Sequence, residues 1–277
     1  MKLENMKNYF LEYVKINLSN GTYLCYKSHL DFTIKYFNER YILDSNEINF
    51  NVLSNFIEYQ KIRGVKNSTI NKRLKPLKLM YRFNNILDNE IFLQKKLKED
   101  KKTFPILSKC EMQKLNIYLS SNKLSFKNQL LIKLLIDTGV RLNEILNIKV
   151  KNINFDNFTI YLDVTKTKKS RYVYFTNDTL KLLIKYIKKS NLTKNDKLFD
   201  LTSSGVLSLF YRIKNTLNFK EFHPHMLRHG LATNLNKKGM SVFEIQQIMG
   251  HENVATTNRY IHLDQDDICH KYLQLMN

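Results

Sequence analysis

The first 93 residues carry four stretches in which apolar side chains recur every three or four positions, separated by short polar breaks. This spacing places the apolar side chains on one face of a helix, so four helices are predicted. We expect breaks at residues 20–22 and at Gly64, a cap at Asn67 or Ser68, and a kink or tightening at Pro76. These four helices are predicted to form a small bundle. The predicted faces are Phe10, Tyr13, Val14 and Ile16; Tyr26, Leu30, Ile34 and Phe37; residues 52–62; and Ile70, Leu74, Leu77 and Tyr81.

Helical spacing continues after a charged, non-periodic stretch. Ser108 and Glu111 have the spacing of a capping box, and Thr138-Gly139 ends a strongly apolar helix. A short helix that presents Arg141 in its first turn comes directly after that break. The predicted helices of this part cover residues 108–119, 130–136, 140–146, 179–188, 205–217 and 264–276.

One region has the period of a strand instead. Residues 158–164 and 171–175 alternate and are rich in β-branched and aromatic side chains. This pattern predicts an antiparallel hairpin, whose tip at residues 165–170 is rich in lysine. The second part of the chain is therefore expected to be mainly helical with a small antiparallel sheet.

Polar and titratable side chains are densest between residues 223 and 260. Leu227, Leu231 and Leu235 recur every four residues and form one helix face. His225 and Arg228 lie off this face, so the leucines can be buried while the polar pair points elsewhere.

A second short helix is expected immediately afterwards. Ser241 and Glu244 form another capping box, and Gly250 ends the helix they start. His251 sits at that break, and Tyr260 follows on a short polar segment.

The chain has a formal net charge of +20, which favours a polyanion as partner. A general enrichment in lysine, asparagine and isoleucine is the alternative explanation. The fourth predicted helix favours nucleic acid as this partner, because its basic residues have no acidic partners at helical spacing. The alternative is an ordinary solvent-exposed face, which would also carry lysines. The candidate phosphate contacts are Lys72, Arg73, Lys75, Lys78 and Arg82; for Lys168 and Lys169 in the hairpin tip, solvation is the favoured alternative.

Other classes of protein fit less well. No apolar run has the length of a transmembrane helix, and the N-terminus lacks the apolar region of a signal peptide, so we expect a cytoplasmic protein without a membrane partner. The three cysteines are far apart and form no CxxC pair. Zinc at His225 and His229 is a weaker alternative, because no acidic residue occupies the general-base position of an HExxH helix. We expect no metal and no cofactor.

The polar cluster contains the chemical groups that are needed for nucleophilic attack on a phosphodiester. Guanidinium groups stabilise the extra charge on the nonbridging oxygens of the transition state, and Arg141 and Arg228 are candidates. Tyr260 can attack phosphorus if His225 takes its proton.

Two further side chains complete this chemistry. His251 can donate a hydrogen bond to the phosphate, and Lys166, at the hairpin tip, can protonate the departing 5′ oxygen.

The order and spacing of these residues resemble the tyrosine recombinase (phage integrase) family over nearly the whole chain. The resemblance rests on Thr138-Gly-Val-Arg141-Leu-Asn-Glu144, the Lys166 hairpin, His225-Met-Leu-Arg228-His229, Gly250-His251 and Tyr260. It implies a SAM-like four-helix core-binding domain at 1–97, a linker at 98–107, and a catalytic domain at 108–277 with the DNA breaking-rejoining enzyme fold and a C-terminal exchange helix. It also implies strand exchange on double-stranded DNA without metal or ATP.

The resemblance also implies roles for single residues. Arg141 and Arg228 would bind the scissile phosphate, and His225 would act as acid and base. Tyr260 would form a 3′-phosphotyrosyl bond that leads to a Holliday junction. Lys166 would protonate the leaving oxygen, and His251 would support the phosphate.

Several points stay open at this stage. Asn143 and Gly230 depart from common family residues, Gly230 is a candidate for close packing, and His223 has no assigned role. The chain would act as a tetramer of itself or with a paralogue, in chromosome-dimer resolution or on a mobile element. A type IB topoisomerase-like enzyme and a non-catalytic DNA-binding relative are the alternatives.

Overall fold

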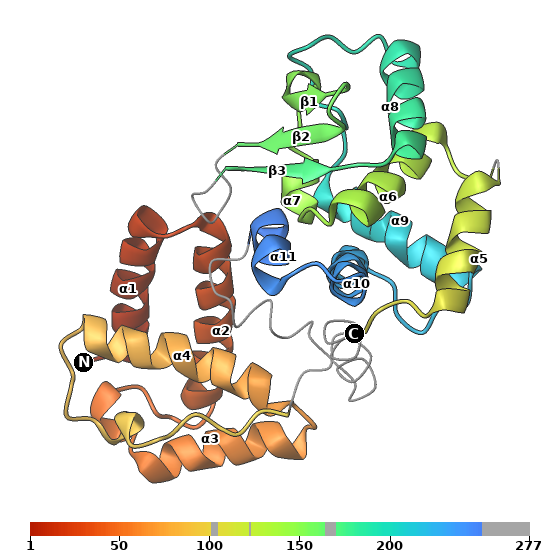
Figure 1. Ribbon diagram of the computed structural model, residues 1–277. Coiled ribbons are helices and arrows are strands. Elements are labelled where there is room, and N and C mark those ends of the chain that lie inside the picture. Colours follow the sequence, from red (N-terminus) through yellow and green to blue (C-terminus); the bar gives the residue numbers. More distant parts are fainter. Residues whose placement is uncertain (101–104, 122, 164–169, 251–277) are drawn as a thin grey trace, which may run out of the picture. The chain divides into compact units, whose positions relative to one another are not determined.

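The computed structural model describes residues 1–100, 105–121, 123–163 and 170–250, which belong to two compact units (Figure 1). The units are Met1–Lys102 and Thr103–Asn277, so the division falls inside the stretch expected as a linker. Each unit has its own hydrophobic core.

The first unit is built from four helices, as the periodicity predicted. Helix α2 packs against both α1 and α4, and α4 also contacts α1 and α3. The largest fully buried side chains here are Phe37, Phe56 and Tyr81, one from each of α2, α3 and α4. The elements are α1 (Leu3–Asn17), α2 (Asn20–Asn38), η1 (Ser45–Glu47), α3 (Phe50–Ile62), α4 (Asn67–Phe83) and η2 (Glu90–Phe92).

Two predictions about the first two helices were wrong in detail. Tyr13 and Ile16 keep 45% and 82% of their surface exposed, because the buried face of α1 runs through Leu3 and Met6 to Phe10 and Val14. The break expected at residues 20–22 lies earlier, because Ser19 caps α2 and its side chain accepts a hydrogen bond from the Thr22 N–H.

The start of α4 also differs from the prediction. Asn67 does not cap the helix but is its first residue, and its side chain donates to the Lys98 carbonyl at 2.8 Å. Asn71 binds the Leu97 backbone through both its amide nitrogen and its amide oxygen, each at 2.9 Å. The chain after the bundle is thereby tied to one side of α4.

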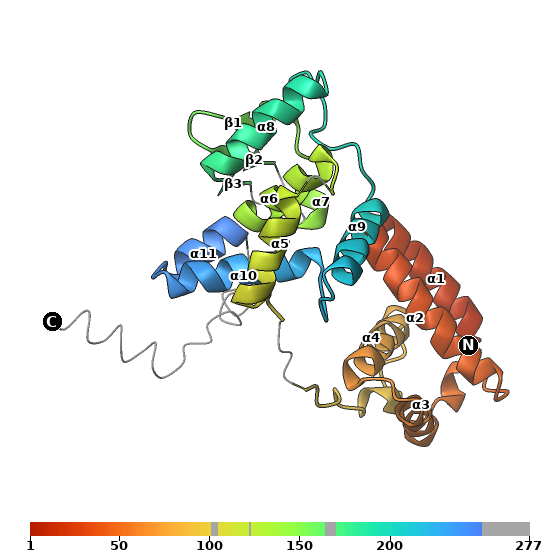
Figure 2. The same cartoon turned by 90° about the vertical axis from the view of Figure 1, so that its right-hand side faces the viewer.

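The second unit places helices around a small antiparallel sheet. Helix α6 buries five consecutive or near-consecutive leucine and isoleucine side chains between residues 130 and 135, and it contacts α8, α10 and β3. Figure 2 shows α10 and α11 beside one another. The elements are α5 (Lys109–Ser120), α6 (Phe126–Thr138), α7 (Leu142–Ile145), η3 (Val150–Asn152), β1 (Ile153–Asn154), β2 (Thr159–Leu162), β3 (Arg171–Tyr174), α8 (Asn177–Lys189), α9 (Ser203–Thr216), α10 (Pro224–Lys237) and α11 (Val242–Met249).

The predicted hairpin is confirmed as β2 and β3, which pair antiparallel with Ile160 opposite Val173. Strand β1 joins β2 as a third strand that the sequence did not indicate, because two residues are too few to show alternation. The mainly helical fold class with a small antiparallel sheet is confirmed. The hairpin tip and the helix expected at 264–276 lie outside the described residues, except for Ser170.

Both predicted capping boxes of this unit are present. In each, the serine N–H donates to the glutamate side chain, at 2.8 Å for Ser108 and Glu111 and at 2.7 Å for Ser241 and Glu244. Gly250 then ends α11 in the left-handed conformation, with φ of 61°.

Candidate active site

Arg141 lies where the chain passes from α6 into α7. Gly139 ends α6 with a left-handed φ of 58°, and Arg141 caps α7. The guanidinium Nη1 donates to Glu144 Oε1 at 2.8 Å, and Nη2 donates to the Gly250 carbonyl at 3.0 Å. The side chain of Arg141 keeps 29% of its surface exposed, so the site retains an accessible guanidinium.

Arg228 reaches the same place from α10 but is buried, with 3% of its surface exposed. Its Nη1 donates to the Gly139 carbonyl at 2.6 Å, and its Nη2 donates to the Met249 carbonyl. The expected leucine face is only partly confirmed, because Leu227 is buried while Leu231 and Leu235 are half-buried against α11. Arg228 therefore points into the protein between two helix ends.

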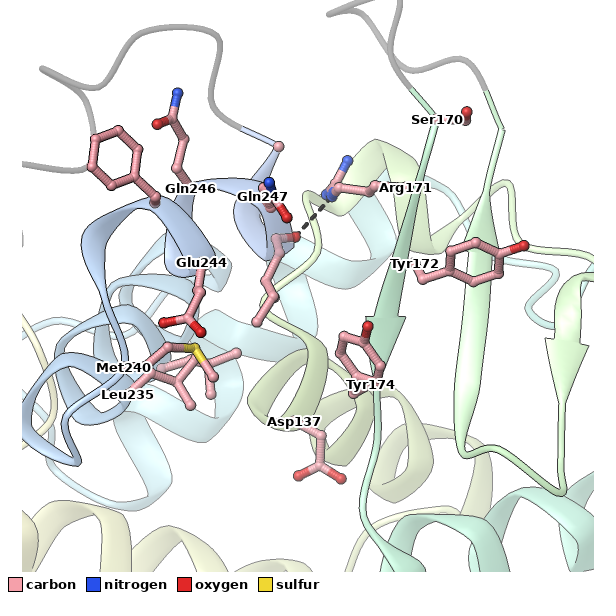
Figure 3. A pocket seen from close by; sticks show the side chains of 14 residues that line it. Asp137, Ser170, Arg171, Tyr172, Tyr174, Leu235, Met240, Glu244, Gln246 and Gln247 are labelled. Carbon is pink, nitrogen blue, oxygen red and sulfur yellow. Dashed lines mark hydrogen bonds between the residues drawn. The ribbon is translucent and has the colours of Figure 1, made fainter.

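A third arginine, which the sequence motifs did not indicate, completes the arrangement. Arg171 begins β3, and its Nε donates to the Ile248 carbonyl at 2.9 Å (Figure 3). Three consecutive carbonyls at the C-terminus of α11 thus accept hydrogen bonds from Arg171, Arg228 and Arg141 in turn. Positive charge is favourable at this end of a helix, where the last carbonyls lack helical partners.

Glu144 joins two of these arginines. Arg171 donates to it through both terminal nitrogens, Nη1 to Oε1 at 3.1 Å and Nη2 to Oε2 at 2.7 Å, and Arg141 Nη1 also donates to Oε1. The Glu144 side chain keeps 8% of its surface exposed. Burial alone would raise the pKa of this carboxyl, but the hydrogen bonds from Arg171 and from the Arg141 backbone outweigh burial and lower it.

The period of β3 was a usable signal for Arg171. Residues 171, 173 and 175 alternate with exposed Tyr172 and Tyr174, so Arg171 shares the buried face of Val173 and Phe175. A charged residue on the buried face of a strand indicates a specific partner.

Three histidines line the first turns of α10. His225 reaches the surface, and partial burial, Arg228, His223 and Arg141 together lower its pKa. Its ring centre lies 6.2 Å from that of the buried His229, whose pKa is lowered to about 4 by burial and by His225, Arg228 and His223. His225 is therefore a neutral imidazole at neutral pH, which is the form that accepts a proton.

The structure brings three of the six predicted catalytic residues together. Arg141 and Arg228 bind the C-terminus of α11, and His225 lies close enough to both for their charges to lower its pKa. The sequence continues from Gly250 into His251. Lys166, His251 and Tyr260 lie outside the described residues, as do Lys168 and Lys169.

The basic residues predicted on α4 do not share one face. Lys72, Lys75 and Arg82 are exposed, whereas Lys78 is half-buried and donates to the Gln94 carbonyl. Arg73 points towards α2 and α3, where its guanidinium carbon lies 3.7 Å from the centre of the Phe32 ring and Nη1 donates to Gln60 at 2.5 Å.

Two further observations concern the described residues only. They contain no group of three or more histidine, cysteine, aspartate or glutamate side chains placed to hold a metal ion. Among the helices that the structure describes, none is long and apolar enough to cross a membrane.

The sequence matches the phage integrase family over residues 105–267 and the N-terminal SAM-like domain of phage integrases over residues 8–85. Tyrosine recombinase XerA of Saccharolobus solfataricus is 40% identical over 151 residues, 54% of this chain and 51% of XerA. Tyrosine recombinase XerC of Bacillus pumilus is 26% identical over 292 residues, 98% of this chain and 95% of XerC.

Solved structures agree with this fold. The Tn1549 transposon integrase, in complex with transposon right end DNA, superposes with a TM-score of 0.81 at 19% identity, covering 100% of both chains. A lambda integrase tetramer bound to a Holliday junction superposes with a TM-score of 0.76 at 15% identity, covering 94% of this chain and 77% of that one.

Proposed function

The chain belongs to the phage integrase family of site-specific tyrosine recombinases, and from that premise we propose that it cleaves and rejoins duplex DNA through a 3′-phosphotyrosyl bond at Tyr260. The observation that carries the proposal is the convergence of Arg141 and Arg228 at the C-terminus of α11, directly before His251 in the sequence, with His225 close enough for both arginines to lower its pKa. The 3′-phosphotyrosyl ester conserves the energy of the broken bond, so the reaction needs neither ATP nor a metal ion.

The residues of this site have distinct tasks in the proposed reaction. Arg141 and Arg228 bind the nonbridging oxygens, whose negative charge grows in the transition state. Neutral His225 accepts the proton of Tyr260 as it attacks phosphorus. His251 supports the phosphate, and Lys166 protonates the departing 5′ oxygen.

DNA binding is shared between the two units in this proposal. The exposed side chains of Lys72, Lys75 and Arg82 contact phosphates, with smaller contributions from the half-buried Arg73 and Lys78. Lys168 and Lys169 add phosphate contacts from the hairpin tip. The protein acts in the cytoplasm, together with its DNA.

The working assembly in this proposal is a tetramer on two DNA sites, and lambda integrase is likewise a tetramer in its structure bound to a Holliday junction. We propose that the four copies are of this chain, or of this chain and a paralogue. Deleting residues 264–277, which leaves Tyr260 in place, should weaken cooperative DNA binding in gel-shift titrations. Unchanged cooperativity would contradict a role for this segment in assembly.

A covalent trapping experiment tests the chemistry. The DNA site is first selected from a random duplex library by binding, then rebuilt as a nicked suicide substrate that loses its 5′ hydroxyl after cleavage. We expect a protein–DNA adduct without divalent metal that disappears in Tyr260→Phe. Absence of the adduct with wild-type protein on its selected site would refute the proposal and favour a non-catalytic DNA-binding relative.

Joint products separate recombination from topoisomerase chemistry. Two labelled duplexes carrying the site should yield Holliday junctions and exchanged strands. Relaxation of supercoiled DNA with no joint molecule would indicate a type IB topoisomerase-like activity instead.

A further inference from the structure

We propose that Arg171 is a positioning residue for the proposed cleavage reaction, holding Arg141 and the C-terminus of α11 in the arrangement that the scissile phosphate requires. The inference rests on the proposed function, which assigns the phosphate to Arg141 and Arg228. In this proposal Arg171 acts through Glu144 and the Ile248 carbonyl, which together engage all three of its guanidinium nitrogens, and not by touching DNA.

Arg171 connects two elements that are distant in the sequence. Two of its nitrogens bind Glu144 in α7, and the third binds the Ile248 carbonyl in α11. All three nitrogens of one rigid, planar group are used, so the positions of α7 and α11 are fixed relative to each other. A lysine presents its donors from a single atom and cannot reproduce this three-way contact.

The fit of Arg171 against Gly250 fixes the same junction. A Cβ atom at Gly250 would lie 2.8 to 2.9 Å from atoms of the Arg171 guanidinium and side chain. The left-handed φ of Gly250 independently favours glycine. Arg171 therefore packs directly on the backbone from which the chain enters His251.

Charge balance gives Arg171 a second effect on Arg141. Glu144 carries one negative charge between two guanidinium groups, so this trio has a net charge of +1. Without Arg171, Glu144 and Arg141 form a neutral pair, and the carboxylate competes with the phosphate for Arg141. The loss of Arg171 should therefore weaken binding of the transition state more than binding of DNA as a whole.

The experiment compares single-turnover cleavage by wild type, Arg171→Ala and Arg171→Lys on the suicide duplex at saturating protein. We expect Arg171→Ala to cleave about 100-fold more slowly, as for a displacement of a catalytic group by about 1 Å. The cleavage rate of Arg171→Lys should lie between those of wild type and Arg171→Ala. The DNA dissociation constants of all three proteins should agree within about twofold. Arg212→Lys, an exposed arginine on α9, is the matched control and should cleave at the wild-type rate.

Chemical rescue distinguishes positioning from a general loss of stability. Arg171 lines a groove of about 950 Å³ between β3 and α11, through which a small cation can reach the vacated space (Figure 3). Guanidinium chloride well below its denaturing concentration should accelerate cleavage by Arg171→Ala, whereas sodium chloride at equal ionic strength should not. Protein folding cannot explain that difference between the two salts.

The outcomes separate the two proposals. Wild-type cleavage rates in Arg171→Ala would overturn the positioning role while leaving the proposed function intact. If Arg171→Ala fails to fold, Arg171→Lys decides, and cleavage at the wild-type rate by a folded Arg171→Lys protein overturns the role. A wild-type protein that forms no adduct overturns the proposed function and this inference together.

Discussion

Arg141 and Arg228 carry the same charge but are held differently, and substitution should reveal this. Arg141→Ala should lower the rate of adduct formation by about 10²- to 10³-fold, as for loss of one transition-state donor, with little change in melting temperature. Arg228→Ala should lower the rate similarly and also the melting temperature, because the Gly139 and Met249 carbonyls lose their buried donor.

Cleavage assays and thermal unfolding of both variants check this contrast, with DNA binding as the control for folding. Equal melting temperatures for Arg141→Ala and Arg228→Ala would contradict the difference in burial on which the expectation depends.

Two glycines of the second unit make a matched pair. A Cβ at Gly230, inside α10, would meet nothing within 4 Å among the described residues, so the close packing considered for Gly230 is not found. Gly230→Ala should raise the unfolding free energy by about 0.5 to 1 kcal/mol, because alanine has the higher helix propensity. Gly139→Ala should lower it, since φ is +58° and a Cβ would lie 2.9 Å from Leu231.

Urea unfolding of the two glycine variants provides the measurement. A Gly230→Ala protein that is less stable than wild type would show that position 230 needs glycine for a reason other than the packing described.

Single residues also show where sequence reasoning ended. Arg141, Arg228 and His225 were found because their residue types and spacing match a chemical task. Arg171 was missed because its role depends on which carbonyls and carboxylate face it, and those partners come from residues 144 and 248. Sequence spacing does not encode such a contact, although the period of β3 placed Arg171 on the buried face.

At the scale of elements, helical period and capping boxes predicted the helices well. The errors concern which face of a helix is buried and which residue caps its first turn. Tyr13 and Ile16 have helical spacing, but the bundle buries the neighbouring face of α1. Asn67 has the right residue type for a cap, yet its side chain binds the Lys98 carbonyl instead.

Substitutions on helix α4 can separate its exposed basic side chains from Arg73, which packs within the bundle. Lys72→Gln and Lys75→Gln should each weaken DNA binding and reduce the slope of log K against log salt by about 0.9 for each phosphate that is no longer neutralised. Arg73→Gln should instead lower the melting temperature, because Arg73 stacks on Phe32 and binds Gln60 within the bundle.

Affinity measured across a salt series, with melting curves for all three variants, checks the assignment. An unchanged salt slope in both lysine variants would place the DNA on another surface of the first unit.

At the scale of the whole molecule, stability should depend on pH through His229. Its pKa in the folded protein is about 4, below the ordinary value of 6.5, because burial and then His225, Arg228 and His223 oppose its protonation. Between these pH values the unfolded chain binds a proton that the folded chain does not. The unfolding free energy should therefore fall as pH decreases from about 6.5 to about 4.

Denaturant titrations at a series of pH values measure this dependence. His229→Gln cannot take up the proton, so its stability should change less over that interval, and the difference between the two proteins removes the contribution of the carboxylates. Identical pH profiles would show that His229 does not carry the effect.

The hydrogen bonds by which the three arginines hold the end of α11 go to main-chain carbonyls. Every amino acid supplies the same main-chain carbonyl, so position 248 can be substituted without loss of the hydrogen bond from Arg171. Gly250 has no such freedom, because its conformation and the space beside it both exclude a side chain. The mutational tolerance of this helix end should therefore drop sharply between two positions that lie only two residues apart.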